Sequence, residues 1–149
     1  MEVRTPLPPV VLLLALILLA AAHVLPPRVQ FVPFPVNLAG LLPLIVGVYL
    51  NPAADGLLKR HGTTVKPFQE SMALVTTGVY RRTRHPMYLG FTLILLGLAF
   101  LLGSAWPFVI VAFFPVLMEV MYVRVEERML RDRFGPEWAA YCTRVRRWI

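Results

Sequence analysis

The chain has 149 residues, of which 58% are hydrophobic, and its formal net charge is +7. A chain of this length has room for one domain, and this hydrophobic content excludes an ordinary water-soluble fold and indicates a protein that lies in a lipid bilayer. The basic residues flank long apolar runs and form no solvated arm, so membrane topology explains the positive charge better than nucleic-acid binding does.

Four apolar segments are expected to be transmembrane helices: Leu7 to Leu25, Val36 to Leu50, Met87 to Leu102, and Trp106 to Val123. A helix needs ~20 residues to cross ~30 Å of hydrocarbon, so flanking residues must extend the second and third segments. The first segment lacks the small-residue cleavage site of a signal peptide. We therefore interpret it as a retained helix.

Proline and glycine define the connections between these segments. Pro26, Pro27, Pro33 and Pro35 predict a non-helical connector between the first two, because proline removes a backbone donor and disfavours helix in the residue before it. Only Gly103-Ser104-Ala105 separates the last two segments. Such a short turn predicts that the third and fourth helices form a tight antiparallel hairpin.

The basic residues predict the orientation of the bundle. Of 15 Lys and Arg residues, six lie from Lys59 to Arg84 and seven from Arg124 to Arg147. Four crossings place both zones on the same side of the membrane, and the positive-inside rule identifies that side as cytoplasmic. The N- and C-termini are then cytoplasmic too.

The C-terminal tail has an apolar stripe at helical spacing, made of Leu130, Phe134, Trp138, Tyr141 and Val145. An arginine-rich face opposite the stripe is typical of an amphipathic helix at the membrane interface, and a helix that only anchors the protein to anionic lipid has the same pattern. Gly135-Pro136 is expected to split this helix. The predicted fold is an all-α membrane protein, one domain over 1–149, with two transmembrane helices in 1–58 and a functional core in 59–149.

Polar residues gather before the third apolar segment. Pro86 excludes helical geometry at His85 and suits the first turn of the following helix. Free backbone N–H groups of that turn should lie beside Arg84, His85 and Tyr88. A helix start of this kind favours an anion such as a carboxylate.

A second polar cluster lies at the end of the fourth segment. Glu119, Tyr122 and Glu126 are spaced three and four apart, which predicts that they share one helical face, and Glu127 adjoins them. Acids at the end of a membrane helix are costly unless they are paired or functional. The hairpin should bring them to Arg84, His85 and Tyr88. A plain ion pair with Arg84 or Arg124 is the alternative explanation.

The ordered set of motifs resembles the isoprenylcysteine carboxyl methyltransferase and phospholipid methyltransferase family of integral membrane enzymes. The resemblance covers residues from Thr63 onward, and the first two helices carry no signature of the family. Its motifs are Leu74-Val75-Thr76-Thr77-Gly78-Val79-Tyr80, Arg84-His85-Pro86-Met87-Tyr88-Leu89-Gly90, Glu126-Glu127, Leu130, Phe134-Gly135, Tyr141 and Arg144-Val145-Arg146-Arg147-Trp148-Ile149.

The resemblance implies transfer of a methyl group from S-adenosylmethionine to a lipophilic acceptor, such as a prenylcysteine carboxylate, a lipid amine or a small thiol. Arg84 and Glu127 are the catalytic candidates. In the family an arginine helps to hold the methyl acceptor. This chain has Tyr122 at the corresponding position, and Arg124 is the nearest arginine that could replace it. The cofactor contacts carried over by position are Met72, Ala73, Leu74, Val75, Tyr80, His85, Pro86, Met87, Tyr88 and Glu126.

The charges agree with this cofactor. Its carboxylate suits a helix start with Arg or His, its amine suits a glutamate, and its sulfonium suits tyrosine faces. The alternatives are a membrane reductase that uses NADPH, which resembles some sterol reductases, and a non-enzymatic module that binds anionic lipid. No metal site is expected, because the three histidines and Cys142 have no metal-ligand spacing. The acceptor and the oligomeric state stay open.

Overall fold

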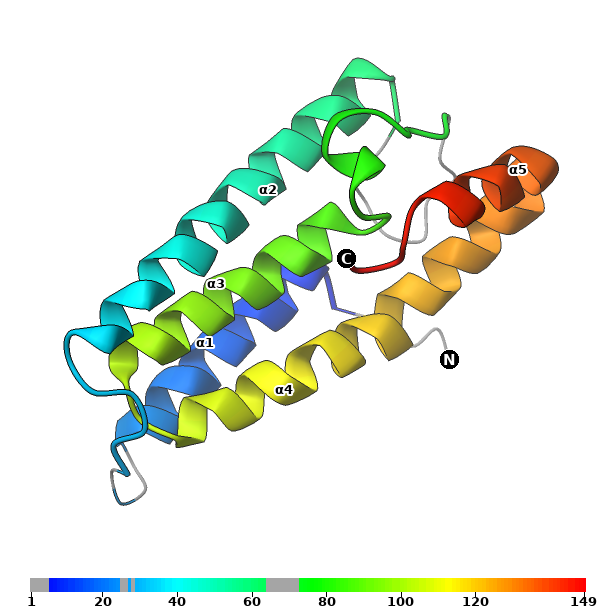
Figure 1. Ribbon diagram of the computed structural model, residues 1–149. Helices are drawn as coiled ribbons and strands as arrows, with labels where there is room; N and C mark the ends of the chain where they lie inside the picture. Colours follow the sequence, from blue (N-terminus) through cyan, green and yellow to red (C-terminus); the bar gives the residue numbers. More distant parts are fainter. Residues whose placement is uncertain (1–5, 25–26, 28, 64–72) are drawn as a thin grey trace, which may run out of the picture.

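The computed structural model describes residues 6–24, 27, 29–63 and 73–149. Its described part is helical, and the β-pairing found there is an isolated bridge between Gln30 and Ser104. The elements in chain order are α1 (Pro8–Val24), the 3-10 helix η1 (Val36–Gly40), α2 (Leu41–Arg60), the 3-10 helix η2 (Gly78–Arg81), α3 (Pro86–Leu102), α4 (Trp106–Met118), the π-helix η3 (Glu119–Val123) and α5 (Arg124–Arg144) (Figure 1).

Two helical stretches are long and apolar enough to cross a membrane by length and composition. They are Val36–Arg60, with 25 residues, and the continuous stretch Trp106–Arg144, with 39 residues. The helices α1 and α3 are apolar but shorter, with 17 residues each. As expected, the second apolar segment is extended by its flank, because α2 continues to Arg60.

The predicted helix boundaries around α3 are confirmed. His85 is non-helical, with φ −127° and ψ 61°, and Pro86 occupies the first turn of the helix. At the other end, Gly103 has φ +71° and adopts the left-handed conformation that ends the helix. Three residues then connect α3 to α4.

Glycines let α2 and α3 approach closely. A Cβ at Gly97 would lie 2.6 Å from the carbonyl oxygen of Gly40, and a Cβ at Gly90 would lie 3.0 Å from that of Gly47. No side chain fits at such distances, so these positions fix the separation of the two helices. Gly90 and Gly97 therefore have a packing role.

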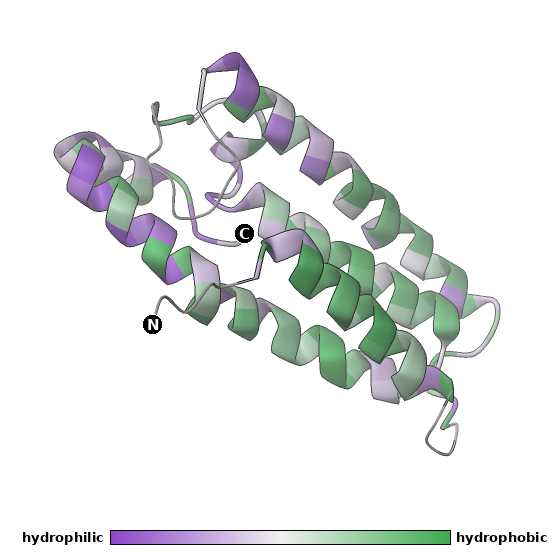
Figure 2. Ribbon diagram, turned by 180° about the vertical axis from the view of Figure 1, so that it is seen from behind, coloured by the Kyte–Doolittle hydropathy of each residue, from purple (hydrophilic) through white to green (hydrophobic). Residues whose placement is uncertain are grey.

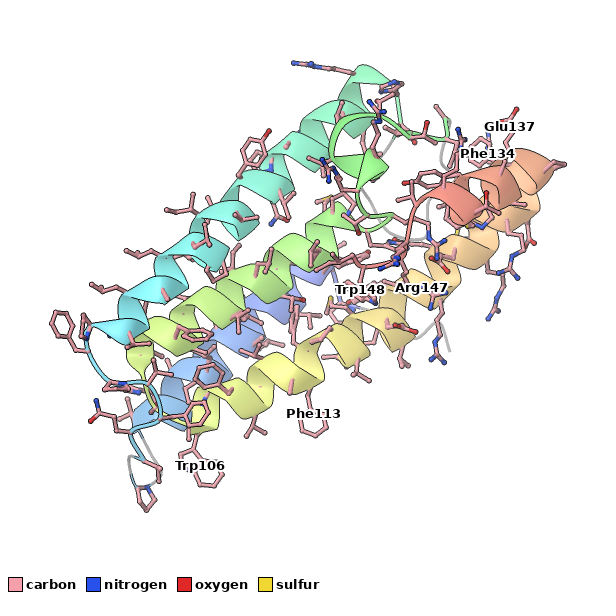
Figure 3. All side chains as sticks on the ribbon, in the orientation of Figure 1. Trp106, Phe113, Phe134, Glu137, Arg147 and Trp148 are labelled. Atoms are coloured by element: carbon pink, nitrogen blue, oxygen red, sulfur yellow. The ribbon has the colours of Figure 1, made fainter. Side chains whose placement is uncertain are left out.

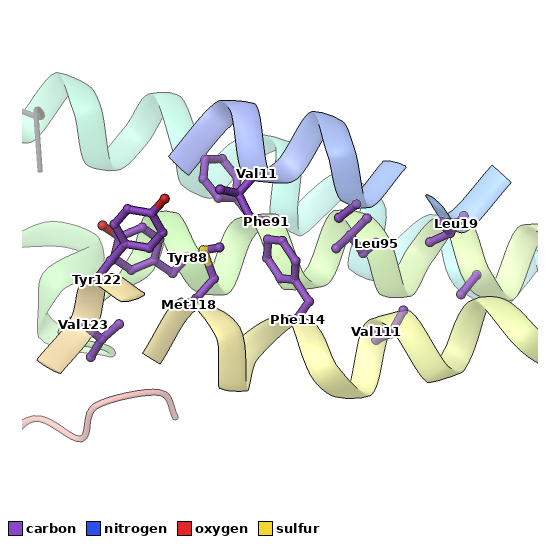
Figure 4. Close-up of a cluster of buried hydrophobic side chains, with 12 residues drawn as sticks. Val11, Leu19, Tyr88, Phe91, Leu95, Val111, Phe114, Met118, Tyr122 and Val123 are labelled. Carbon is purple, nitrogen blue, oxygen red and sulfur yellow. The ribbon is translucent and has the colours of Figure 1, made fainter. Parts of the chain in front are cut away.

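On the other face of α3, apolar side chains from α1, α3 and α4 form the main core (Figure 4). Leu19, Leu95, Phe114 and Met118 are almost fully buried there. By contrast, the outward faces of α2 and α4 expose large apolar side chains, among them Leu42 at 71% and Phe113 at 69%. Exposed apolar faces of this extent suit a lipid surround.

Hydrophilic residues gather at one end of the bundle, where the C-terminal end of α2, η2 and α5 lie (Figure 2). The described parts of the two basic zones are therefore at the same end, as the four-segment interpretation requires. The opposite end carries the connections between α1 and η1 and between α3 and α4 (Figure 1).

The apolar stripe of the tail is not presented to an interface. Trp138, Tyr141 and Val145 are buried and pack with Leu130 and Phe134 in one cluster. Gly135, with φ +43°, kinks α5 and turns its two halves toward each other, so the predicted split is confirmed. The stripe forms an internal core because this kink lets it pack on itself, so the stripe does not face lipid as an amphipathic helix was expected to present it. The position of this helix at a membrane interface stays a prediction.

Candidate functional site

The residues before α3 meet the carboxylates of α5, as the sequence predicts. Arg84 donates from Nε to Oε1 of Glu127 at 3.1 Å, and a second guanidinium nitrogen lies 3.0 Å from the same oxygen. Nε2 of His85 lies 3.3 Å from Glu127 Oε1. His85 and Glu127 are both buried. This cluster therefore holds its charges out of water in compensating pairs.

The adjacent carboxylate has different partners. The Tyr88 hydroxyl donates to Oε1 of Glu126, and Nδ1 of His85 lies 3.6 Å from the other carboxylate oxygen. In the described part of the chain, no arginine or lysine pairs with Glu126. Its side chain is 24% exposed, against 6% for Glu127. Glu126 is thus the less compensated and more accessible of the two acids.

Three rings stack beside these carboxylates. The His85 and Tyr88 rings have centroids 5.9 Å apart, and Tyr88 stacks in turn on Tyr122 at 5.9 Å (Figure 4). Tyr122 is fully buried and donates its hydroxyl to the carbonyl of Pro6 at 2.5 Å. The stack joins the start of α3 to η3 and presents aromatic faces next to Glu126.

The π-helix corrects the predicted face of Glu119, Tyr122 and Glu126. A π-helical turn inserts one extra residue, so the side chains after it are rotated relative to those of a regular α-helix. Glu119 consequently aligns with Glu127, and both bind Arg147. Tyr122 and Glu126 remain together on the side of Tyr88. Local π-helical insertions of this kind occur often at functional sites.

Arg84 is fixed by more than its carboxylate. Its guanidinium lies 5.7 Å from the Trp138 ring centroid and donates to the carbonyl of Val145 at 3.2 Å. Its backbone N–H donates to the carbonyl of Arg146 at 3.1 Å. The folded tail therefore forms one wall of the site, which explains why the apolar stripe is turned inward.

The environment shifts two titrating groups outside the apolar helices. Burial lowers the pKa of His85, but the hydrogen bonds and charges of Glu126 and Glu127 outweigh burial and raise this pKa above its usual value. For the Tyr80 phenol, burial acts in the opposite direction and raises the pKa above its usual range, and the charge of Glu126 raises it further. His85 therefore favours its protonated form and Tyr80 stays neutral.

The segment before η2 packs beside this site. Val75 and Tyr80 are buried with Ala54 of α2, with Met87 against them, whereas Leu74 packs against the tail cluster. The hydroxyl of Tyr141 donates to the carbonyl of Tyr80 at 2.7 Å, which ties the tail to η2.

Other predicted residues have different outcomes. Pro86 is fully buried and Ala73 is half-buried. Met72 lies outside the described residues. Arg124 does not join the cluster: its side chain is 62% exposed and lies 3.5 Å from Glu119. Of the two residues predicted for the acceptor, only Tyr122 lies at the site.

Sequence reasoning gave no role to Arg147 or Thr83. The Arg147 side chain binds Glu127 and Glu119, and its carbonyl accepts a hydrogen bond from the Thr83 hydroxyl at 2.9 Å. Arg147 does lie in the C-terminal motif of the resemblance. Three arginines within four residues give no signal that selects this one.

Comparisons with known proteins agree with this arrangement. A family model described as phospholipid methyltransferase matches residues 36–137. The probable protein-S-isoprenylcysteine O-methyltransferase of Oryza sativa subsp. indica is 34% identical over 114 residues, which cover 74% of this chain and 59% of the relative. Protein-S-isoprenylcysteine O-methyltransferase A of Arabidopsis thaliana is 34% identical over 110 residues, 71% of this chain and 55% of the relative.

A shorter match joins the chain to protein-S-isoprenylcysteine O-methyltransferase of Saccharomyces cerevisiae, which is 40% identical over 84 residues, 54% of this chain and 34% of the relative. The chain spans little more than half the length of the first plant relatives. No solved structure gives a significant match.

The family match over more than half of the chain defines the class of protein, and the described residues have a helical fold. The chain belongs to the phospholipid methyltransferase family, and the resemblance that its motifs carry is confirmed.

Proposed function

We propose that this protein is an S-adenosylmethionine-dependent methyltransferase that is embedded in a membrane and acts on a lipophilic acceptor. The family match supports the reaction class. The observation that carries the proposal to particular residues is Glu126, a partly exposed carboxylate beside Tyr88 and the start of α3.

The residues present fit the charges of this cofactor. Glu126 can accept the ammonium group, because in the described residues it has no arginine or lysine partner. The first turn of α3 offers backbone donors to a carboxylate. When bound, S-adenosylmethionine supplies an activated methyl group on a sulfonium centre. The aromatic rings of Tyr88 and Tyr122 lie beside Glu126 and add an electron-rich surround that favours a cation nearby.

The chain's own residues contribute position and exclusion of water. Arg84 and Glu127 are paired with each other, and their side chains are only 11% and 6% exposed, which suits a scaffold that fixes the first turn of α3. Direct methyl displacement is helped by alignment and desolvation and requires no dedicated base. We therefore assign no proton transfer to these residues.

We further propose four membrane crossings by α1, the stretch from η1 to α2, α3, and the stretch from α4 to η3, with α3 and α4 as an antiparallel hairpin. A helix of 17 residues spans ~25 Å, close to the hydrocarbon thickness. Both basic zones and both termini are then cytoplasmic. The acceptor enters the site from the bilayer, because the exposed apolar faces of α2 and α4 adjoin the bilayer in this arrangement.

The proposal is tested by methyl transfer. The protein in detergent–lipid micelles receives donor with a radiolabelled methyl group and either a prenylcysteine, a phospholipid amine or a short water-soluble analogue of each. Transfer to one lipophilic acceptor, with much less to its soluble analogue, is the expected result. Equal transfer to soluble analogues would contradict the lipophilic acceptor, and no transfer to any acceptor would contradict the reaction.

A further inference from the structure

Arg147 bridges two acids that lie eight positions apart on the long helix. It donates from Nε to Oε1 of Glu127 at 3.1 Å and binds the second oxygen of that carboxylate through another nitrogen. Its third nitrogen donates to Oε1 of Glu119 at 3.1 Å. Figure 3 places Arg147 and Trp148 between the start of α3 and the long helix. Each of the three guanidinium nitrogens therefore makes a hydrogen bond to one of the two acids.

Because Arg147 binds Glu127, the neighbouring Glu126 and Glu127 differ in the number of their cationic partners. Glu127 is held by two guanidinium groups, those of Arg84 and Arg147, and by His85. Glu126 accepts a hydrogen bond from Tyr88 and lies near His85, and no guanidinium group in the described part of the chain pairs with it. Two adjacent carboxylates repel each other and compete for the same cations. Full compensation of one leaves the other open to a ligand's positive charge.

We propose that Arg147 is a positioning residue that assigns separate roles to the two glutamates. By compensating Glu127 it keeps Arg84 and His85 in place and leaves Glu126 as the carboxylate that receives the donor's ammonium group. This inference rests on the proposed function and adds a residue to it. Loss of Arg147 would leave Glu127 with one guanidinium fewer and draw His85 away from Glu126.

The tail around Arg147 is built to hold it in place. Trp148 donates from Nε1 to Glu119 at 3.3 Å, and Thr83 fixes the Arg147 carbonyl. The neighbouring Arg146 is exposed, and only its backbone carbonyl takes part in a hydrogen bond with Arg84. Arg146→Gln is therefore a matched control that removes one positive charge from the same segment.

The first measurement needs no donor. His85 faces Glu126 and Glu127 of α5 and Tyr88 of α3, and Arg147 influences it through Glu127. Arg147→Gln removes a positive charge that compensates Glu127, so the imidazole titration of His85 should move to higher pH. NMR of the histidine rings follows this titration, with His85→Gln to assign the signal. An unchanged titration in Arg147→Gln, or an equal shift in Arg146→Gln, would overturn the proposal.

The second measurement uses steady-state kinetics. Arg147→Gln should raise KM for the donor about tenfold and change kcat less than about threefold, because the loss concerns donor binding. Arg146→Gln should stay within about twofold of the wild type. A donor KM that is unchanged in Arg147→Gln would contradict the assigned role.

Arg147→Lys keeps the test open if Arg147→Gln does not fold. A lysine retains the charge but cannot hold both acids with a planar fork, so a donor KM raised about threefold is expected. A wild-type KM in this variant would overturn the proposal. Absence of methyl transfer by the wild type would instead contradict the proposed function, while the His85 titration would still test Arg147.

Discussion

Each end of the helical bundle holds a histidine that joins distant parts of the chain, and the two histidines face different chemistry. His85 lies between Glu126 and Glu127 and is buried. His23, at the other end, has Nδ1 2.7 Å from the hydroxyl oxygen of Ser104, and forms no ion pair among the described residues.

The rest of each end follows the same division. Near His23, neutral hydrogen bonds close the connections: Asn37 donates to the carbonyl of Leu101 and Trp106 to that of Pro27. Near His85, arginines and glutamates compensate one another. Because buried charge costs more than buried neutral polarity, its concentration at one end marks the region where charge is used. At the other end, the described residues join the connections through neutral hydrogen bonds.

The largest expected effect separates the two ends by activity. Glu126→Gln removes the negative charge but keeps the side-chain size, and we expect kcat/KM for the donor to fall about 100-fold. His23→Gln should change it less than about threefold. Methyl-transfer kinetics in micelles measure both. Comparable losses in the two variants would remove the functional distinction between the ends.

The glycines at which α2 and α3 approach closely lie between the two ends of the bundle. A Cβ at Gly90 would lie 2.5 Å from Nδ2 of Asn51, so we expect Gly90→Ala to destabilise the fold by about 2 kcal/mol. Gly56 in the same pair of helices has open space, and Gly56→Ala should stabilise by about 0.5 kcal/mol. Thermal unfolding in detergent compares them. Equal behaviour would show that close packing is not what fixes the helix separation.

The pH dependence of stability should distinguish the buried His85 from the exposed His61. The folded-state pKa of His85 is raised, so its contribution is fully present below about pH 6.5 and is lost as pH rises through the folded pKa. Each unit of elevation contributes about 1.4 kcal/mol. The stability difference between wild type and His85→Gln should therefore shrink as the pH rises above about 6.5. His61→Gln, at an exposed residue, is the control; the same slope in both would refute the assignment.

The smallest expected effect concerns Ser104. Ser104→Ala removes the neutral hydrogen bond with His23 and should lower the free energy of unfolding by about 1 kcal/mol, with no change in KM for the donor. Unfolding and kinetics on the same preparation test both parts. A changed donor KM would show that a substitution at the end that holds His23 alters donor binding at the site.

Local signals made the start of α3 predictable. Pro86 fixes its own φ and restricts His85, so the boundary and the neighbouring polar residues follow from two positions. The meeting of Tyr88 with Glu126 also followed, because three residues connect α3 and α4. Convergence of the cluster is thus a consequence of short-range geometry.

Tertiary features were not predictable. No residue pattern announces the π-helix, so the assignment of Glu119 to the face of Glu126 was wrong. The kink at Gly135 was visible, but not that it would bury the stripe and bring Arg147 to Glu127. Arg124 was selected by sequence proximity, and the helix directs it to the surface. These outcomes depend on packing between residues far apart in the chain.

Calorimetric binding of S-adenosylmethionine, S-adenosylhomocysteine and NADPH tests the central claim most directly. The protein in detergent, its Glu126→Gln variant and an exposed control, Glu137→Gln, are compared. Selective binding of the two adenosyl ligands, weakened in Glu126→Gln and unchanged in Glu137→Gln, is the predicted result. Binding of NADPH alone, or no adenosyl binding by a folded protein, would contradict the account.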